Sequence, residues 1–218
     1  MPTAILLNLG FDATVLLSLI PQLSSGDRLI LVLPKVVVER LMSTVEDVKK
    51  TVRSLSVKGV KVSVDTLQVD DEDIGLALDQ LTEVVDELKR EGYEVHVDAG
   101  SGVRSIVVAL TLLYQLSQGA VGRGFTRTER TGMRVELPKP IPCRVRWRDM
   151  LEKMFEVEEA TVDLVASSLR KDDSTVRRGL KELRELGLLN YRRKGQKGIY
   201  KITPLGRAMC RIMRWRGF

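Results

Sequence analysis

The sequence predicts a doubly wound α/β domain with a mostly parallel sheet, followed by a smaller α+β domain. Over residues 1–137, short aliphatic runs alternate with longer amphipathic stretches, which is the pattern of βαβ units. Prolines at positions 138, 140 and 142 then mark a stiff linker, because proline fixes its own φ and restricts the preceding residue. We therefore expect domains at 1–137 and 145–218, joined by a linker at 138–144.

The elements of the first domain follow from length and periodicity. Short aliphatic runs fit buried strands, and apolar residues spaced three or four apart fit helices. Right-handed crossovers then favour the Rossmann-like strand order 3-2-1-4-5. The expected strands are Ala4–Leu9, Arg28–Leu33, Val60–Val69 and Tyr93–Val97, with a final pair at Gly119–Phe125 and Met133–Leu137. The expected helices are Thr14–Leu23, Val37–Leu55, Ile74–Glu91 and Val103–Leu116.

In this strand order the first and fourth strands are neighbours, and ligands bind beyond their carboxyl ends, where the winding reverses. Gly10, Phe11 and Asp12 follow the first strand. They could place an aromatic face and a carboxylate beside a ribose or a base. Alternatively, Phe11 covers the core and Asp12 caps the next helix.

The loop after the fourth strand, Asp98–Arg104, has the composition of a phosphate site. Its glycines let backbone approach a ligand, and the helix that it opens attracts phosphate through unpaired N–H groups and its dipole. Arg104 could add a bidentate contact. A tight turn with an N-capping serine is the alternative. The candidate ligand-binding residues are Gly10, Phe11, Asp12, Asp98, Gly100, Ser101, Gly102, Val103 and Arg104.

Several kinds of site are not favoured. No Gly-x-Gly-x-x-Gly follows the first strand and no Gly-x-x-x-x-Gly-Lys-Ser/Thr occurs, which argues against a dinucleotide cofactor and a P-loop ATPase. A single His96, with Cys143 and Cys210 outside metal-ligand spacing, argues against a metal site. We assign no catalytic residue, metal or cofactor. Two cysteines fit a reducing cytoplasm, and no apolar run is long enough to span a membrane.

Charge separates the two segments. Residues 1–140 carry 16 Lys/Arg and 19 Asp/Glu, a net charge of −3, whereas residues 141–218 carry 19 and 10, a net charge of +9. Positive charge concentrated in one segment indicates a polyanionic partner for that segment.

The second segment predicts three helices, a basic hairpin and a last helix. We expect helices at Val145–Glu156 and Val162–Leu169, then a turn with Asp173 as the N-cap of the third helix. That helix ends at Gly187. Its expected buried residues are Val176, Leu180, Leu183 and Leu186. The expected hairpin strands are Leu188–Tyr191 and Ile199–Ile202. We interpret Thr203–Arg214 as a dimerisation helix that offers Leu205, Met209, Ile212 and Met213.

An amphipathic helix followed by a basic hairpin is how a winged helix-turn-helix contacts duplex DNA. A winged helix that binds protein is the alternative, but basic residues on both the helix and the hairpin favour DNA. The candidate DNA-binding residues are Ser174, Thr175, Arg177, Arg178, Lys181, Arg192, Arg193, Lys194 and Lys197.

The layout and the two loops resemble those of CRISPR-associated Rossmann-fold (CARF) proteins with a C-terminal winged helix-turn-helix, which are archaeal regulators of CRISPR loci. The second loop of that family runs roughly Asn, any residue, Thr/Ser, Gly, Gly, any residue, Arg/Lys. Gly102 and Arg104 match this pattern. Asp98 stands in place of the Asn, Gly100 in place of the hydroxyl residue, and Ser101 in place of the first Gly.

The resemblance implies a homodimer that binds cyclic oligoadenylate, typically the tetra-adenylate, on its two-fold axis as a regulatory ligand. It also implies transcriptional control of CRISPR or adaptation genes. Two alternatives stay open. One is a ring nuclease, in which Ser101 and Arg104 position in-line attack by a ribose 2′-hydroxyl. The other is a scaffold that recruits CRISPR effector proteins.

Overall fold

The chain forms two units, Met1–Ile141 and Pro142–Phe218, in the computed structural model. The structure describes residues 1–57, 59–117, 119–128, 130–138, 147–194 and 197–215. The expected linker at 138–144 therefore lies outside the described residues, apart from Pro138. Within these ranges, no helix combines the length and the apolar character that crossing a bilayer requires.

A six-stranded sheet forms the centre of the first unit, with the order β3-β2-β1-β4-β5-β6. The first five strands in this order pair in parallel, whereas β6 pairs antiparallel with β5. The predicted order 3-2-1-4-5 is therefore confirmed. Leu7 pairs with Asp98, so the loops after β1 and β4 leave the same edge of the sheet. The strands are β1 (Thr3–Asn8), β2 (Arg28–Pro34), β3 (Ser63–Val69), β4 (Glu94–Asp98), β5 (Arg123–Arg127) and β6 (Arg134–Glu136).

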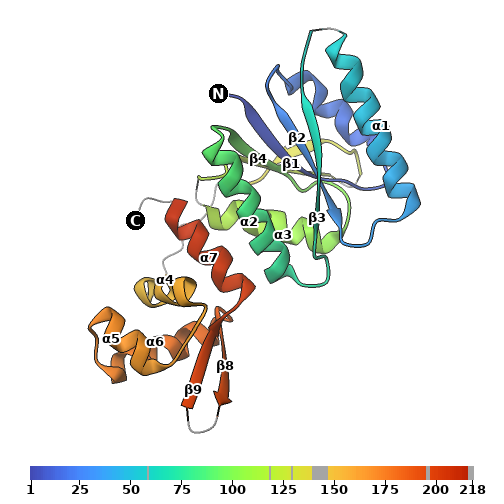
Figure 1. The fold of residues 1–218 in the computed structure, drawn as a ribbon. Helices are drawn as coiled ribbons and strands as arrows, with labels where there is room; N and C mark the ends of the chain where they lie inside the picture. Colours follow the sequence, from blue (N-terminus) through green and yellow to red (C-terminus); the bar gives the residue numbers. More distant parts are fainter. Residues whose placement is uncertain (58, 118, 129, 139–146, 195–196, 216–218) are drawn as a thin grey trace. The chain divides into compact units, whose positions relative to one another are not determined.

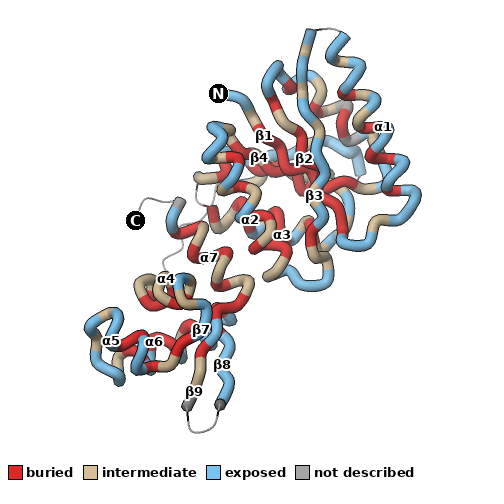
Figure 2. Tube along the Cα trace, in the orientation of Figure 1, coloured by how far each residue is buried: buried red, intermediate tan, exposed pale blue. Residues whose placement is uncertain are grey.

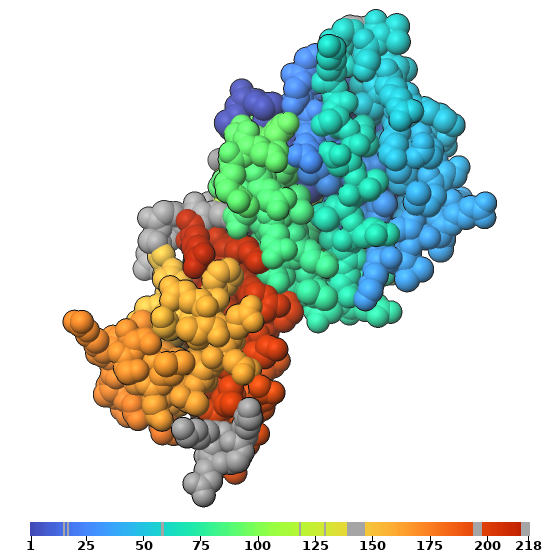
Figure 3. Space-filling model, in the orientation of Figure 1, coloured from blue at the N-terminus to red at the C-terminus, as the bar shows by residue number. Residues whose placement is uncertain are grey.

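Helices cover both faces of this sheet (Figure 1). One face carries α1 (Glu39–Ser56) and two short 3-10 helices, whose apolar residues join those of β1 and β2 in one cluster. The other face carries α2 (Ile74–Arg90) and α3 (Arg104–Ser117). Because both faces are covered, the central strands are buried almost without interruption (Figure 2). On the outside, α1, β3 and α2 form most of the surface of this unit in the view of Figure 3.

The prediction of one helix over Thr14–Leu23 is wrong. This stretch folds as η1 (Ala13–Ser18) and η2 (Ile20–Gln22). Pro21 has no N–H to donate, which interrupts an α-helical hydrogen-bond series at this point.

The second unit contains four helices and a small antiparallel sheet among its described residues, with the strand order β7-β9-β8. Its core gathers apolar residues from every helix and from the hairpin. The helices are α4 (Arg148–Val157), α5 (Val162–Leu169), α6 (Asp173–Glu185) and α7 (Pro204–Trp215). The strands are β7 (Glu159–Ala160), β8 (Leu189–Lys194) and β9 (Lys197–Ile202).

Three expectations for this unit need correction. Asp172, not Asp173, caps α6 by accepting a hydrogen bond from the Thr175 amide at 2.8 Å. Leu186 lies at the end of α6 with 62% of its surface exposed, because the helix turns it away from the core. The hairpin strands are longer than predicted and reach Lys194 and Lys197.

The side chains that we expected α7 to offer for dimerisation are buried or partly buried within the chain, and dimerisation through this helix stays a prediction. Ile212 and Met213 are buried, and Met213 belongs to the core of the second unit. Leu205 and Met209 pack against the same core from partly buried positions. Leu205, Met209 and Met213 of α7 therefore stabilise their own unit.

Candidate functional site

The loops after β1 and β4 meet at the carboxyl edge of the sheet, as expected. A Cβ on Gly10 would lie 2.9 Å from the amide nitrogen of Gly102. Gly102 has φ +79°, and a Cβ there would overlap Asn8 Oδ1 and lie 2.8 Å from the Leu9 carbonyl oxygen. Glycine at both positions is what allows the two backbones to approach this closely.

Asn8 and Ser101 join the two loops. The Ser101 hydroxyl donates a hydrogen bond to the Asn8 carbonyl oxygen at 2.5 Å, and Asn8 Nδ2 donates to the Val103 carbonyl oxygen at 3.1 Å. Ser101 therefore holds the loops together in this structure and is not an N-cap. Asn8 is fully buried, and sequence reasoning missed it, although a polar residue ending an aliphatic strand was a usable signal.

Gly100 lies against an arginine side chain of β5. A Cβ on Gly100 would overlap Cγ of Arg127 and lie 2.8 Å from its Cδ. The missing side chain therefore makes room for an arginine of β5.

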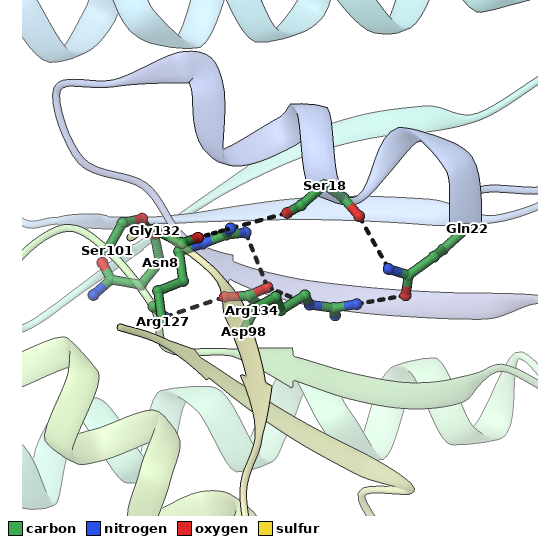
Figure 4. Close-up of polar contacts among 9 residues, drawn as sticks. Asn8, Ser18, Gln22, Asp98, Ser101, Arg127, Gly132 and Arg134 are labelled. Atoms are coloured by element: carbon green, nitrogen blue, oxygen red, sulfur yellow. Dashed lines mark hydrogen bonds and ion pairs between the residues drawn. The ribbon is translucent and has the colours of Figure 1, made fainter. Parts of the chain in front are cut away.

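Asp98 lies fully buried behind the loop (Figure 4). Its Oδ1 accepts a hydrogen bond from the Gly100 amide at 3.1 Å. Its Oδ2 lies 2.9 Å from Arg134 Nε and 3.4 Å from Arg127 Nη2. Only 9% of the Arg127 side chain and 8% of the Arg134 side chain are exposed. Asp98 therefore holds two buried guanidinium groups instead of facing a ligand itself.

Both arginines also form hydrogen bonds with side chains of η1 and η2 (Figure 4). Arg127 Nη1 donates to Ser18 Oγ at 2.9 Å, and Arg134 Nη1 donates to Gln22 Oε1 at 2.5 Å. Burial lowers the pKa of Arg134, and the charge of Asp98 opposes that change. We call Asp98, Arg127, Arg134, Ser18 and Gln22 the arginine network. It ties the loop after β4 to β5, β6, η1 and η2.

A cleft of about 520 Å³ opens beside the two loops. Phe11 lines it with 55% of its surface exposed, and the guanidinium of Arg40 lies 5.1 Å from the centre of its ring. Phe11 thus does not cover the core. Asp12 caps η1, as the alternative interpretation predicted, because its Oδ1 accepts a hydrogen bond from the Thr14 amide at 2.8 Å. The other lining residues are Leu9, Gly10, Pro34, Val36, Val38, Leu41, Gly102 and Val103, together with the acidic residue Asp71.

Arg104 is exposed as the first residue of α3. It stands immediately after Val103, which lines the cleft. The described parts of the chain hold no group of three or more His, Cys, Asp or Glu residues arranged to bind a metal ion.

In the second unit, the basic residues Arg177, Arg178 and Lys181 of α6 are exposed. Ser174, which was also predicted to contact DNA, donates a hydrogen bond from its hydroxyl to Asp172 Oδ1 at 2.5 Å. This bond, together with the Thr175 amide, holds the pKa of Asp172 well below its ordinary value. Ser174 therefore stabilises the start of the helix in this structure.

Several of the predicted DNA-binding cations have intramolecular partners. The Arg178 guanidinium lies 5.8 Å from the centre of the Trp147 ring. Lys181 Nζ is 3.8 Å from Glu185 Oε1, and Arg192 Nη2 is 2.9 Å from Glu159 Oε2. Arg177 and Arg193 are exposed and line one pocket. The side chains of Lys194 and Lys197 lie outside the described part of the structure.

A protein-family model, described as the Csa3 CRISPR-associated Rossmann-like domain, matches residues 3–138. No curated protein sequence matches the chain.

Three solved structures are similar to this chain at low sequence identity. The protein VC1899 from Vibrio cholerae is 14% identical with a TM-score of 0.43, over 97% of this chain and 65% of that one. A type III CRISPR defence DNA nuclease activated by cyclic oligoadenylate is 16% identical with a TM-score of 0.40, over 85% and 30%. Can2 from Sulfobacillus thermosulfidooxidans, in complex with cyclic tetra-adenylate, is 11% identical with a TM-score of 0.36, over 99% and 65%. The chain thus spans less than two thirds of the length of each of these three.

Proposed function

The chain belongs to the family of the Csa3 CRISPR-associated Rossmann-like domain, and from this premise we propose that it is a ligand-responsive transcriptional regulator of CRISPR-associated genes. Residues 1–137 sense the ligand, and residues 145–218 form a winged helix-turn-helix that binds duplex DNA. The ligand is cyclic oligoadenylate, which the resemblance to CARF proteins implies.

One observation carries the ligand site. Two loops from neighbouring parallel strands meet at Gly10 and Gly102, and they border a cleft of about 520 Å³. A volume of this size suits a small-molecule ligand. Phe11 offers a ring face to a base, and Arg104 offers a guanidinium to a phosphate.

A homodimer follows from the symmetry of the ligand. A cyclic oligonucleotide of identical units suits an isologous interface, in which both copies present the same loops. The exposed side of α3 fits such an interface, because Arg104, Val108 and Leu112 recur at four-residue spacing. Val108 and Leu112 are 44% and 36% exposed, which leaves an apolar stripe next to the ligand loop.

The DNA-binding role rests on the charge and order of the second unit. α5 and α6 pack together, and the hairpin β8–β9 follows α6 directly. Arg177, Arg178 and Lys181 lie on the exposed side of α6. This arrangement suits insertion of α6 into a major groove, with the hairpin over the flanking backbone.

The regulatory mechanism is a coupling free energy between the two sites. If cyclic oligoadenylate binds one arrangement of the dimer more tightly, it shifts the population toward that arrangement. The ligand then changes the affinity for DNA by the same factor as DNA changes the affinity for the ligand.

Two substitutions in the full chain test this function. Arg104→Ala should lower affinity for cyclic tetra-adenylate at least tenfold, because a charge-assisted phosphate contact is lost, and should leave ligand-free DNA binding unchanged. Arg178→Ala should do the reverse. Calorimetry with cyclic tetra-adenylate and a mobility shift with DNA from upstream of the gene measure the two affinities. Lys50→Ala, an exposed charge removed from α1, is the matched control.

The outcomes are distinct. A wild-type chain that binds neither cyclic oligoadenylate nor the upstream DNA contradicts the proposal. Linear products after incubation with labelled cyclic tetra-adenylate would identify a ring nuclease instead. Ligand binding without DNA binding would favour the scaffold.

A further inference from the structure

A second hollow lies within residues 142–218, between α6 and the hairpin. Its volume is about 320 Å³, and we call it the α6–hairpin pocket. Arg177 of α6 and Arg193 of β8 line it from two different elements. The remaining lining residues that matter here are Asp163 at the start of α5, with Tyr191 and Tyr200 on the hairpin.

Arg177 and Arg193 differ from the neighbouring cations of α6 and β8. Arg178 and Arg184 lie over aromatic rings, and Lys181 and Arg192 face carboxylates. Among the residues that the structure describes, neither Arg177 nor Arg193 has a hydrogen bond, ion pair or ring contact. Two exposed arginines thus line one hollow, and neither forms an ion pair among the described residues.

We propose that the α6–hairpin pocket binds a single backbone phosphate of duplex DNA, held by Arg177 and Arg193 together. The inference rests on the proposed DNA binding and specifies how the second unit is positioned on the duplex. Guanidinium groups form charge-assisted, often bidentate, hydrogen bonds with phosphate. Because the pocket lies between helix and hairpin, this contact fixes the register of the protein on DNA without reading sequence.

Tyr191 completes the pocket. A Cβ on Gly198 would lie 2.6 Å from the Tyr191 hydroxyl oxygen, so the tyrosine lies directly across this glycine. Its hydroxyl can donate a further hydrogen bond to phosphate, as tyrosines do at protein–DNA interfaces.

Asp163 supplies the opposing charge. Its carboxylate lines the same pocket and is exposed in the first turn of α5. An anion in the pocket would be repelled by this carboxylate, so Asp163 weakens phosphate binding. Removing its charge should therefore act in the opposite direction to removing either arginine.

Fluorescence anisotropy with a labelled duplex from upstream of the gene tests the proposal on the full chain. Arg177→Ala and Arg193→Ala should each lower DNA affinity by about tenfold, similarly for specific and unrelated duplexes. Because both arginines bind the same phosphate, the double variant should lose less than the two single losses combined. Its slope of log affinity against log salt should decrease by about one phosphate contact, not two. Asp163→Asn should raise affinity severalfold.

Lys153→Ala removes a positive charge from α4 in the same unit, where Lys153 Nζ pairs with Glu156 Oε2 at 2.9 Å, and is the matched control. Thermal unfolding checks that each variant is folded at the assay temperature. If the wild-type chain binds DNA but the double variant binds like the control, the pocket is not a phosphate site. Independent, additive losses with a slope change near two would also overturn the shared phosphate. If the wild-type chain does not bind DNA, the proposed function itself fails.

Discussion

Arg127 and Arg134 in the first unit are almost entirely buried beside Asp98, whereas Arg177 and Arg193 in the second are exposed and form no ion pair among the described residues. The first pair is fixed by one carboxylate, by Ser18 and by Gln22. The second pair faces an open pocket. Buried arginines with a counterion build structure, and exposed arginines that converge without one are suited to bind an anion.

This contrast also explains an unusual residue. Asp98 stands where the resembling family has Asn, and a carboxylate close to a phosphate would be repelled. Two guanidinium groups neutralise it from behind the loop. The aspartate is therefore a counterion of the arginine network.

The largest effect is expected when the buried arginine pair, Arg127 and Arg134, loses its counterion. Asp98→Asn leaves two buried guanidinium groups without their carboxylate, which should cost about 3–5 kcal/mol of the stability of the first unit. The two tryptophans, Trp147 and Trp215, both belong to the second unit. Urea unfolding should therefore show an early transition by far-UV circular dichroism that tryptophan fluorescence does not follow.

Asp65→Asn is the matched control for this change. Asp65 pairs with Arg28 at 2.7 Å, but 47% of its side chain is exposed. An exposed pair contributes at most about 1 kcal/mol. Equal costs for the two variants would contradict a counterion role for Asp98.

A smaller effect separates two glycines, one from each unit. Gly102→Ala should cost about 2–4 kcal/mol and abolish binding of cyclic tetra-adenylate, because its φ is +79° and the new Cβ meets Asn8 and Leu9. Gly187 has a similar φ of +73°, but a Cβ there would have no other atom within 4 Å among the described residues. Gly187→Ala should therefore cost only about 1 kcal/mol. Chemical unfolding and calorimetry measure both, and similar costs would mean that the loops are not tightly joined.

The smallest effect concerns the cap of α6. Hydrogen bonds from Ser174 and Thr175 lower the pKa of Asp172 in the folded chain below its ordinary 3.8. The ionised cap therefore stabilises the second unit above that pH, and this contribution is lost as the pH falls below about 4. Asn also caps helices but does not titrate. The melting temperature of wild type, followed by tryptophan fluorescence, should fall more steeply on acidification than that of Asp172→Asn. Parallel curves would rule out the low pKa.

Sequence reasoning recovered the order of elements because aliphatic runs and helical spacing are local signals. It also brought together the loops at Gly10 and Gly102, since the strand order follows from crossover handedness. It missed Arg127 and Arg134. These residues follow Asp98 by 29 and 36 positions in the sequence, and their pairing with it depends on how β5 and β6 pack beside β4. Similarly, the local pattern could not tell that the Ser101 hydroxyl would be used by Asn8.

The two outer strands of the large sheet limit how copies of this chain can associate. β3 exposes Ser63, Asp65 and Thr66 along one margin, and β6 offers only three residues, Arg134–Glu136, at the other. Short or polar margins resist the addition of a foreign strand. Growth of the sheet into a continuous ribbon between molecules is therefore disfavoured, which protects a concentrated solution of this protein from fibrous aggregation.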